Sequence, residues 1–102
     1  MAKLSKAEIA ESLEGLAAWK LEGKTIAKGF EFPSFPEAIR FVNKVAGLAE
    51  SADHHPDILI NYRRVTLTLS TDSEGGLTKK DFQLARQIEN GRHSMVAGEV
   101  RL

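Results

Sequence analysis

The spacing of apolar residues changes along this chain, and these changes restrict its fold more than any other feature. In some segments apolar residues recur every three or four positions, which is the pattern of an amphipathic helix with one buried face. In the segments between them apolar and polar residues alternate, which is the pattern of a half-buried strand. The predicted helices cover residues 5 to about 16, 34–49 and 78 to about 92, and the predicted strands cover residues 19–21, 26–32, 58–62 and 65–69.

Each predicted helix begins with the same short pattern, a Ser or Thr followed three residues later by an acidic residue. In this arrangement side-chain oxygens accept hydrogen bonds from backbone amides that have no partner in the first turn. The three pairs are Ser5 with Glu8, Ser34 with Glu37, and Thr78 with Asp81.

The predicted strands follow one another in two pairs, separated by the middle helix. Short turns at Glu22-Gly23 and within residues 61–64 make each pair a hairpin, and hairpin strands are antiparallel. We therefore expect an α+β fold in the order αββαββα, with helices packed on one face of a four-stranded antiparallel sheet. Such a sheet has a bare face and free edges, so we expect pairing with a second copy. Residues 91–102 have no clear period and are predicted to form a frayed helix end or a tail.

Composition limits the size and the setting of this fold. The 102 residues fit a single domain, 1–102, with one modest core. Fourteen basic and fourteen acidic residues give zero net charge, which disfavours direct binding to nucleic acid or anionic lipid. The sequence has no cysteine, no signal-like segment and no apolar run long enough to cross a bilayer. We therefore expect a cytoplasmic protein that has neither disulfides nor a thiolate metal site.

The tripeptide His54-His55-Pro56 is the most informative candidate for chemistry. It lies where a predicted helix ends and a predicted strand begins, and Pro56 fixes the backbone after the two rings. Two imidazoles held in a turn can serve as an acid and a base. The alternative is that both are ordinary turn residues, half solvated and half packed. Glu50 lies one helical turn before His54, where its carboxylate can orient that ring, and Asp53 lies beside them.

A second polar group is predicted at the same end of the sheet. The loop 70–76 carries Asp72, and Asp81 lies just beyond it in the third helix, so these carboxylates and the histidines can form one polar cleft. Asp81 also has a structural alternative, because it completes the capping pattern at Thr78. Tyr62, at the end of a strand, is suited to packing or to lining the cleft. We expect no metal site, because adjacent histidines rarely bind one ion and no third ligand follows at a suitable spacing.

Taken together, these residues and their spacing resemble the pterin-4a-carbinolamine dehydratase family. The similarity extends over roughly residues 5 to 90 in register, and the combined spacing is highly specific. The matching positions are Glu50, His54, His55, Pro56, Tyr62, Thr71, Gly76, Leu77, Thr78 and Asp81, with Trp19, Phe30, Phe32, Phe35, Ala38, Phe41, Val45 and Ala46 upstream.

The resemblance implies an enzyme that eliminates water from a 4a-hydroxytetrahydropterin to give a quinonoid dihydropterin, in tetrahydrobiopterin recycling. It implies a pterin as the small-molecule substrate, no cofactor, and a homodimer or homotetramer of the fold described above. For catalysis we expect one histidine to act as acid to the departing hydroxyl while the other polarises or deprotonates the ring. The residues assigned to catalysis are His54, His55, Asp72 and Glu50, and those assigned to substrate binding are Asp53, Pro56, Tyr62 and Asp81.

One position departs from the family pattern. The residue after Thr71 is commonly a third catalytic histidine, sometimes a tryptophan, and here it is Asp72. An aspartate there can act as a base, or it can hold a neighbouring histidine in its protonated form. The departure also keeps a second class of function open, a binding or regulatory module such as a dimerisation partner of a transcription factor. A third alternative is support of molybdenum-cofactor enzymes through the same pocket.

Overall fold

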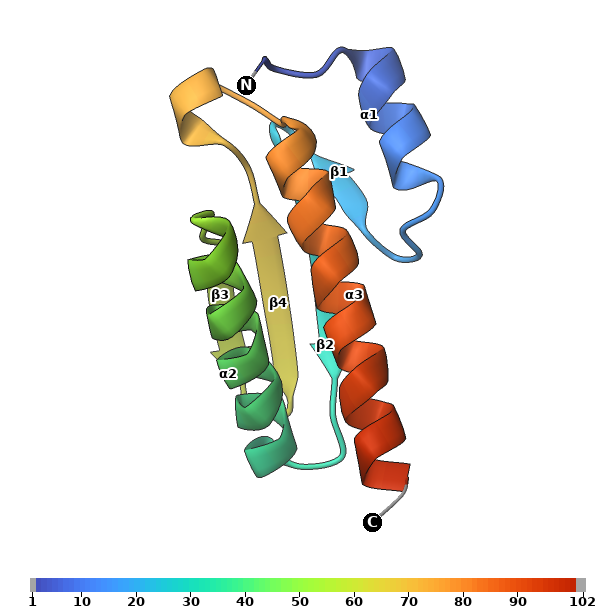
Figure 1. Cartoon of the computed structure of the whole chain (residues 1–102), viewed down its shortest axis with the longest axis vertical. Helices are drawn as coiled ribbons and strands as arrows, with labels where there is room; N and C mark the ends of the chain where they lie inside the picture. Colours follow the sequence, from blue (N-terminus) through green and yellow to red (C-terminus); the bar gives the residue numbers. More distant parts are fainter. Residues whose placement is uncertain (1, 101–102) are drawn as a thin grey trace.

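The chain forms two layers, with helices on one face of an antiparallel sheet (Figure 1). The computed structural model describes residues 2–100, with side chains for residues 2–92. The fold class and the order αββαββα are therefore confirmed, with one added 3₁₀ turn before the last helix. In chain order the elements are α1 (Lys6–Leu13), β1 (Lys20–Glu22), β2 (Thr25–Glu31), α2 (Phe35–Ala52), β3 (Asp57–Asn61), β4 (Arg64–Leu69), η1 (Asp72–Glu74) and α3 (Lys79–Val100).

The sheet has the strand order β1-β2-β4-β3, and every neighbouring pair is antiparallel. The two predicted hairpins are β1–β2 and β3–β4, and β2 pairs with β4 at the centre. The register places Phe30 opposite Val65 and Ile26 opposite Leu69, so the apolar sides of both central strands face the helices. β3 is left as an edge strand, and all five of its residues are exposed.

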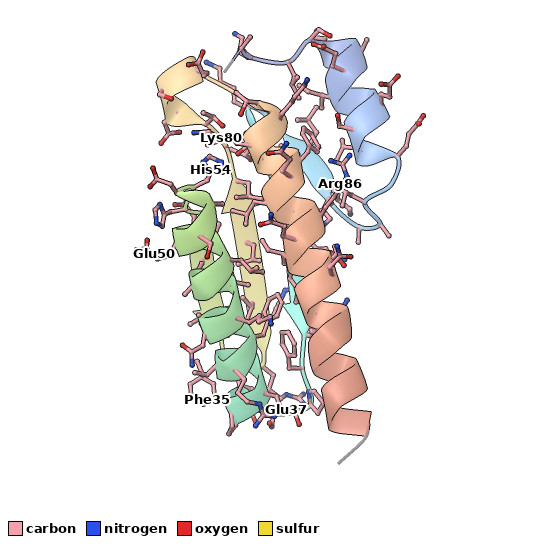
Figure 2. All side chains as sticks on the ribbon, in the orientation of Figure 1. Phe35, Glu37, Glu50, His54, Lys80 and Arg86 are labelled. Atoms are coloured by element: carbon pink, nitrogen blue, oxygen red, sulfur yellow. The ribbon has the colours of Figure 1, made fainter. Side chains whose placement is uncertain are left out.

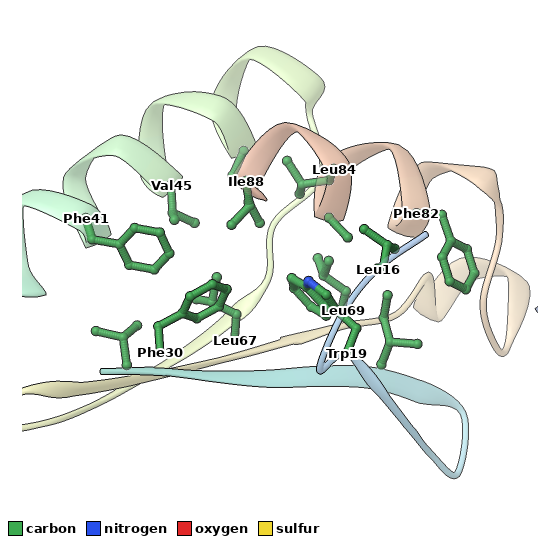
Figure 3. Close-up of a cluster of buried hydrophobic side chains, with 14 of the residues drawn as sticks. Leu16, Trp19, Phe30, Phe41, Val45, Leu67, Leu69, Phe82, Leu84 and Ile88 are labelled. Carbon is green, nitrogen blue, oxygen red and sulfur yellow. The ribbon is translucent and has the colours of Figure 1, made fainter. Parts of the chain in front are cut away.

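The core lies between this face of the sheet and the helices α2 and α3 (Figure 3). The aromatic rings of Phe30 and Phe41 meet at its centre, with centroids 4.8 Å apart. Full burial of one such side chain contributes on the order of 1.5–3 kcal/mol. α1 is more peripheral: none of its residues is fully buried, and only Ile9 and Leu13 pack against the core.

A buried ionic cluster joins β2 to α3 within this core. Both Lys28 Nζ and Trp19 Nε1 donate to Glu89 Oε2, at 2.6 and 2.8 Å. The side chain of Lys28 is only 9% exposed. The cluster satisfies a lysine on the helix-facing side of the sheet, where an unpaired charge would be costly.

Helix ends differ from the predicted ends at three places. α2 continues to Ala52, three residues beyond its predicted end. The first helix ends at Leu13 rather than about residue 16, because Gly15 and a series of turns follow, and Leu16 is buried in the core from outside the helix. The prediction that the last helix ends near Arg92 was wrong, since α3 continues to Val100. Adding residues to an existing helix is far easier than starting one, so a weak pattern can continue it. Of the predicted tail, residues 101–102 lie outside the described part of the chain.

Candidate active site

The end of α2 determines where the two histidines lie. α2 ends at Ala52, and Asp53 then adopts a left-handed conformation with φ of 50°. The Asp53 amide donates to the Glu50 carbonyl at 3.2 Å, and the His54 amide donates to the Ala49 carbonyl at 3.1 Å, as in a Schellman-type helix end. This reversal separates the side chains of His54 and His55.

His54 lies between the end of α2 and the first turn of α3, as Figure 2 shows beside Lys80. Its Nε2 is 2.6 Å from Asp81 Oδ1. The histidine side chain is 11% exposed and the aspartate side chain is fully buried. The structure therefore brings together two predicted site residues that are 27 positions apart in sequence.

The other carboxylate oxygen of Asp81 accepts hydrogen bonds from two donors. Its Oδ2 accepts from the Thr78 amide at 2.9 Å and from Thr71 Oγ1 at 2.8 Å. The bond to the Thr78 amide is half of the predicted capping pattern, while the Thr78 hydroxyl accepts from the Lys80 amide at 3.2 Å. Asp81 thus caps α3, as predicted, and contacts His54 at the same time.

The hydrogen bonds of Asp81 determine which nitrogen of His54 is available. Both oxygens of an ionised carboxylate accept, so the proton between Asp81 and the ring lies on Nε2. Among the described side chains, Nδ1 has no hydrogen-bond partner, and no polar side-chain atom there is buried without one. Nδ1 is therefore at least partly exposed to solvent. A ring fixed through one nitrogen and free at the other is suited to proton exchange.

His55 forms a second, very different pair. Its Nε2 is also 2.6 Å from a carboxylate oxygen, Glu50 Oε1, but the two side chains are 57% and 80% exposed. The prediction that Glu50 would meet His54 was wrong. The left-handed turn at Asp53 directs His54 inward, and His55 lies over the last turn of α2 instead.

The other predicted site residues lie within two positions in sequence of His54 or of Thr71, which donates to Asp81, with the exception of Tyr62. Pro56 is half-buried directly before β3, and the side chain of Asp53 is exposed. Asp72 begins η1 and is exposed, with its Oδ1 accepting from the Ser70 hydroxyl at 3.1 Å. Tyr62 lies at the opposite end of β3, in the β3–β4 turn, where it is 67% exposed. Within one chain the structure does not bring Tyr62 to the histidines.

Thr71 is the polar residue whose contact to the site the sequence reasoning missed. A signal for it exists: Val65, Leu67 and Leu69 face the core at every second position, and position 71 continues that series with a hydroxyl. A polar residue in the buried phase of a strand needs a partner, and here the partner is Asp81.

Among the described side chains, no group of three or more His, Cys, Asp or Glu is placed to hold a metal ion. Within residues 2–100, the helices lack the combination of length and apolar character that crossing a bilayer requires.

These observations define a class, an α+β protein with a buried histidine–aspartate pair at one end of its sheet. The family model described as pterin 4 alpha carbinolamine dehydratase matches residues 2–91. The chain belongs to the pterin-4a-carbinolamine dehydratase family.

Relatives and solved structures agree with this assignment. A protein of Roseiflexus sp. (strain RS-1) named "Putative pterin-4-alpha-carbinolamine dehydratase" is 58% identical over 87 residues, 85% of this chain and 94% of the relative. A protein of the same name from Chloroflexus aurantiacus (strain J-10-fl) is 54% identical over 89 residues, 87% of this chain and 96% of the relative. The crystal structure of a transcriptional coactivator/pterin dehydratase from Brucella melitensis matches with a TM-score of 0.83 and 36% identity, over 87% of this chain and 97% of that one.

A more distant structure matches with a TM-score of 0.62 and 25% identity, over 72% of this chain and 88% of the other. It is a pterin dehydratase-like protein identified as a RuBisCO assembly factor in the alpha-carboxysome. The same fold therefore occurs in proteins whose names describe different roles.

Proposed function

We propose that this protein is a hydro-lyase that converts a 4a-hydroxytetrahydropterin to the quinonoid dihydropterin and water, in tetrahydrobiopterin recycling. The observation that carries the proposal is the buried pair of His54 and Asp81, which leaves one ring nitrogen accessible. Both residues match the family pattern, and relatives more than half identical carry the dehydratase name.

The reaction needs two proton movements and no change in oxidation state. The bond between C4a and its hydroxyl breaks, and a proton must reach that hydroxyl so that it leaves as water. A proton leaves a nitrogen of the pterin ring, and the electron pair of that N–H bond allows the nitrogen to form the new double bond to C4a. Positioned acid and base groups typically contribute about 10²- to 10⁴-fold each to such steps.

We assign to His54 Nδ1 the role of the acid that protonates the departing hydroxyl. Asp81 holds the opposite nitrogen of this ring and stabilises the charge that the ring carries before transfer. His55 then polarises the pterin ring or accepts its proton, with Glu50 orienting it. Asp53 and Pro56 shape the turn that separates the two rings.

Asp72 replaces the histidine that is common at its position, and its chemistry differs accordingly. An ionised carboxylate accepts hydrogen bonds and protons but does not donate them. We assign to Asp72 the role of a second acceptor for the pterin nitrogen, held by the Ser70 hydroxyl. Its exposed position at the start of η1 leaves it accessible to a substrate.

We further propose that two copies associate through β3. The strand is a free sheet edge with large apolar side chains exposed: Ile58 is 37% exposed, Leu59 63% and Ile60 40%. Two identical edges related by a two-fold axis pair antiparallel. The β3–β4 turn of a second copy, with its Tyr62, then comes to the Pro56 end of the first strand, which supports the predicted role of Tyr62 in substrate binding.

The absence of cysteine supports a reducing, cytoplasmic setting.

A second candidate function is a binding or regulatory module built on the same site. Asp72 favours it, because the usual third histidine is missing. The names of the Brucella coactivator and of the RuBisCO assembly factor describe such roles for proteins of this fold.

The dehydration rate of freshly generated 4a-hydroxytetrahydropterin separates the two candidates. We expect the purified protein to accelerate the reaction, and His54→Ala to lose about 10²- to 10⁴-fold of that rate. Asp72→His serves as the matched gain-of-function variant. If the parent is inactive and Asp72→His is active, the dehydratase proposal fails and the binding module is favoured.

A further inference from the structure

Two threonine hydroxyls are buried together beneath Asp81. Thr71 is 7% exposed, and Thr78 and Asp81 are fully buried. The two hydroxyl oxygens are 2.9 Å apart, and Thr71 Oγ1 is 2.8 Å from Asp81 Oδ2. The two threonines come from different segments, one following β4 and the other preceding α3, and the Thr71–Gly76 bridge closes the loop between them.

The direction of each hydrogen bond in this group follows from counting protons. A hydroxyl has one proton to donate. The Thr71 hydroxyl donates its hydrogen bond to Asp81. In the bond between the two hydroxyls, Thr78 is therefore the donor and Thr71 the acceptor. The Thr78 oxygen in turn accepts from the Lys80 amide. The chain of donors therefore starts at the first turn of α3 and ends at Asp81.

We propose that Thr71 and Thr78 are positioning residues that hold the Asp81 carboxylate in the orientation in which its Oδ1 accepts from His54 Nε2, and so preserve the tautomer that this contact selects. Their donor chain, with the Thr78 amide, occupies Oδ2 of Asp81, so Oδ1 alone faces His54. The carboxylate cannot rotate without breaking these hydrogen bonds. His54 consequently keeps its proton on Nε2 and presents Nδ1 to solvent. This inference rests on the proposed function for its catalytic consequence only.

A merely structural role for Thr71 makes different predictions. Thr71→Val keeps the shape of the side chain but removes the proton that Asp81 accepts, and it also removes the acceptor of the Thr78 hydroxyl. If Thr71 only fills space, the valine variant behaves as the parent. If it positions Asp81, the carboxylate released in Thr71→Val turns away from His54, and the ring then also populates the Nδ1–H tautomer. Thr71→Ser, which keeps the hydroxyl, restores the parental state.

The test is long-range ¹H–¹⁵N NMR of the intact protein labelled with ¹⁵N-histidine, at a pH at which the His54 ring is neutral. Ring nitrogen shifts distinguish the Nε2–H from the Nδ1–H tautomer. We expect Nε2–H alone in the parent and in Thr71→Ser, and a mixture in Thr71→Val. Thr68→Val is the matched control, because this threonine lies on the opposite face of β4 from Leu67 and Leu69. It should leave the His54 shifts unchanged.

The dehydration rate is measured on the same samples. We expect kcat of Thr71→Val to fall about tenfold to hundredfold, the range known for loss of the hydrogen-bond partner of a metal ligand, and Thr71→Ser to stay within about threefold of the parent. Unchanged His54 shifts in a folded Thr71→Val protein would overturn the inference, as would a mixture already present in the parent. An inactive parent with the predicted shifts would refute the proposed function and leave the tautomer assignment supported.

Discussion

His54 and His55 are neighbours in sequence, and each has a ring nitrogen 2.6 Å from a carboxylate oxygen. Their surroundings nevertheless differ. The His54–Asp81 pair is 11% and 0% exposed, whereas the His55–Glu50 pair is 57% and 80% exposed. Exposed pairs contribute about 0–1 kcal/mol to folding, while removing one partner of a buried pair costs about 3–5 kcal/mol. Distance alone therefore does not rank these pairs, and burial does.

The largest effect is expected from Asp81→Asn. In either orientation the amide presents its NH₂ group to a donor, because Thr71, the Thr78 amide and His54 all donate to this carboxylate. We expect a loss of about 10²- to 10⁴-fold in kcat and about 3 kcal/mol in the free energy of unfolding. Kinetics and urea unfolding measure both. A kcat loss below tenfold would show that the buried pair is not the reacting one.

Lys28→Met separates burial from function. The Lys28–Glu89 pair is also buried, but it joins β2 to α3 within the core and has no part in the proposed site. We expect the free energy of unfolding to fall by about 2–4 kcal/mol, since Trp19 is then the one hydrogen-bond partner left to the Glu89 charge among the side chains of residues 2–92. The kcat of the folded fraction should stay within about twofold of the parent. A large loss of kcat would mean that removing any buried charge near α3 disturbs the site, so that an effect of Asp81→Asn would not identify the reacting pair.

A much smaller effect is expected from Glu50→Gln. This carboxylate is exposed, so its loss should change the free energy of unfolding by less than about 1 kcal/mol and kcat by less than about tenfold. Added salt should weaken the His55–Glu50 interaction and leave the His54–Asp81 pair nearly unaffected. Repeating the kinetics in 0.1 and 1 M NaCl checks this contrast. Equal salt sensitivity of Glu50→Gln and Asp81→Asn, each against the parent, would contradict it.

The smallest effect concerns a third hydrogen-bonded carboxylate, Glu8 in the first turn of α1. The Ser5 backbone amide, which donates to Glu8 Oε1 at 2.8 Å, and then the Ser5 hydroxyl hold the pKa of Glu8 below its ordinary value of 4.5. Because the pKa is lowered in the folded state, this contribution to stability is present above about pH 5 and is lost as the pH falls through the folded pKa. Melting temperatures of the parent and Glu8→Gln should therefore differ at neutral pH and converge toward pH 3. A constant difference would contradict this.

Most of the fold follows from sequence periods, because each strand and helix buries a face that its own residues define. The end of α3 does not follow in this way, since Gly91 and the weak pattern after it resemble a helix stop although the helix continues. The sequence named candidate site residues one by one, but it did not predict how they pair. His54 meets Asp81 only because Asp53 reverses the chain and α3 packs beside α2, and both depend on tertiary structure.

The most direct measurement is a double-mutant cycle on kcat with His54→Ala, Asp81→Asn and the double variant. If Asp81 acts through His54, the double variant loses no more than His54→Ala alone, within about threefold. Losses that multiply would mean that the two residues act independently, and the account of a single buried pair that exchanges protons through Nδ1 would be contradicted.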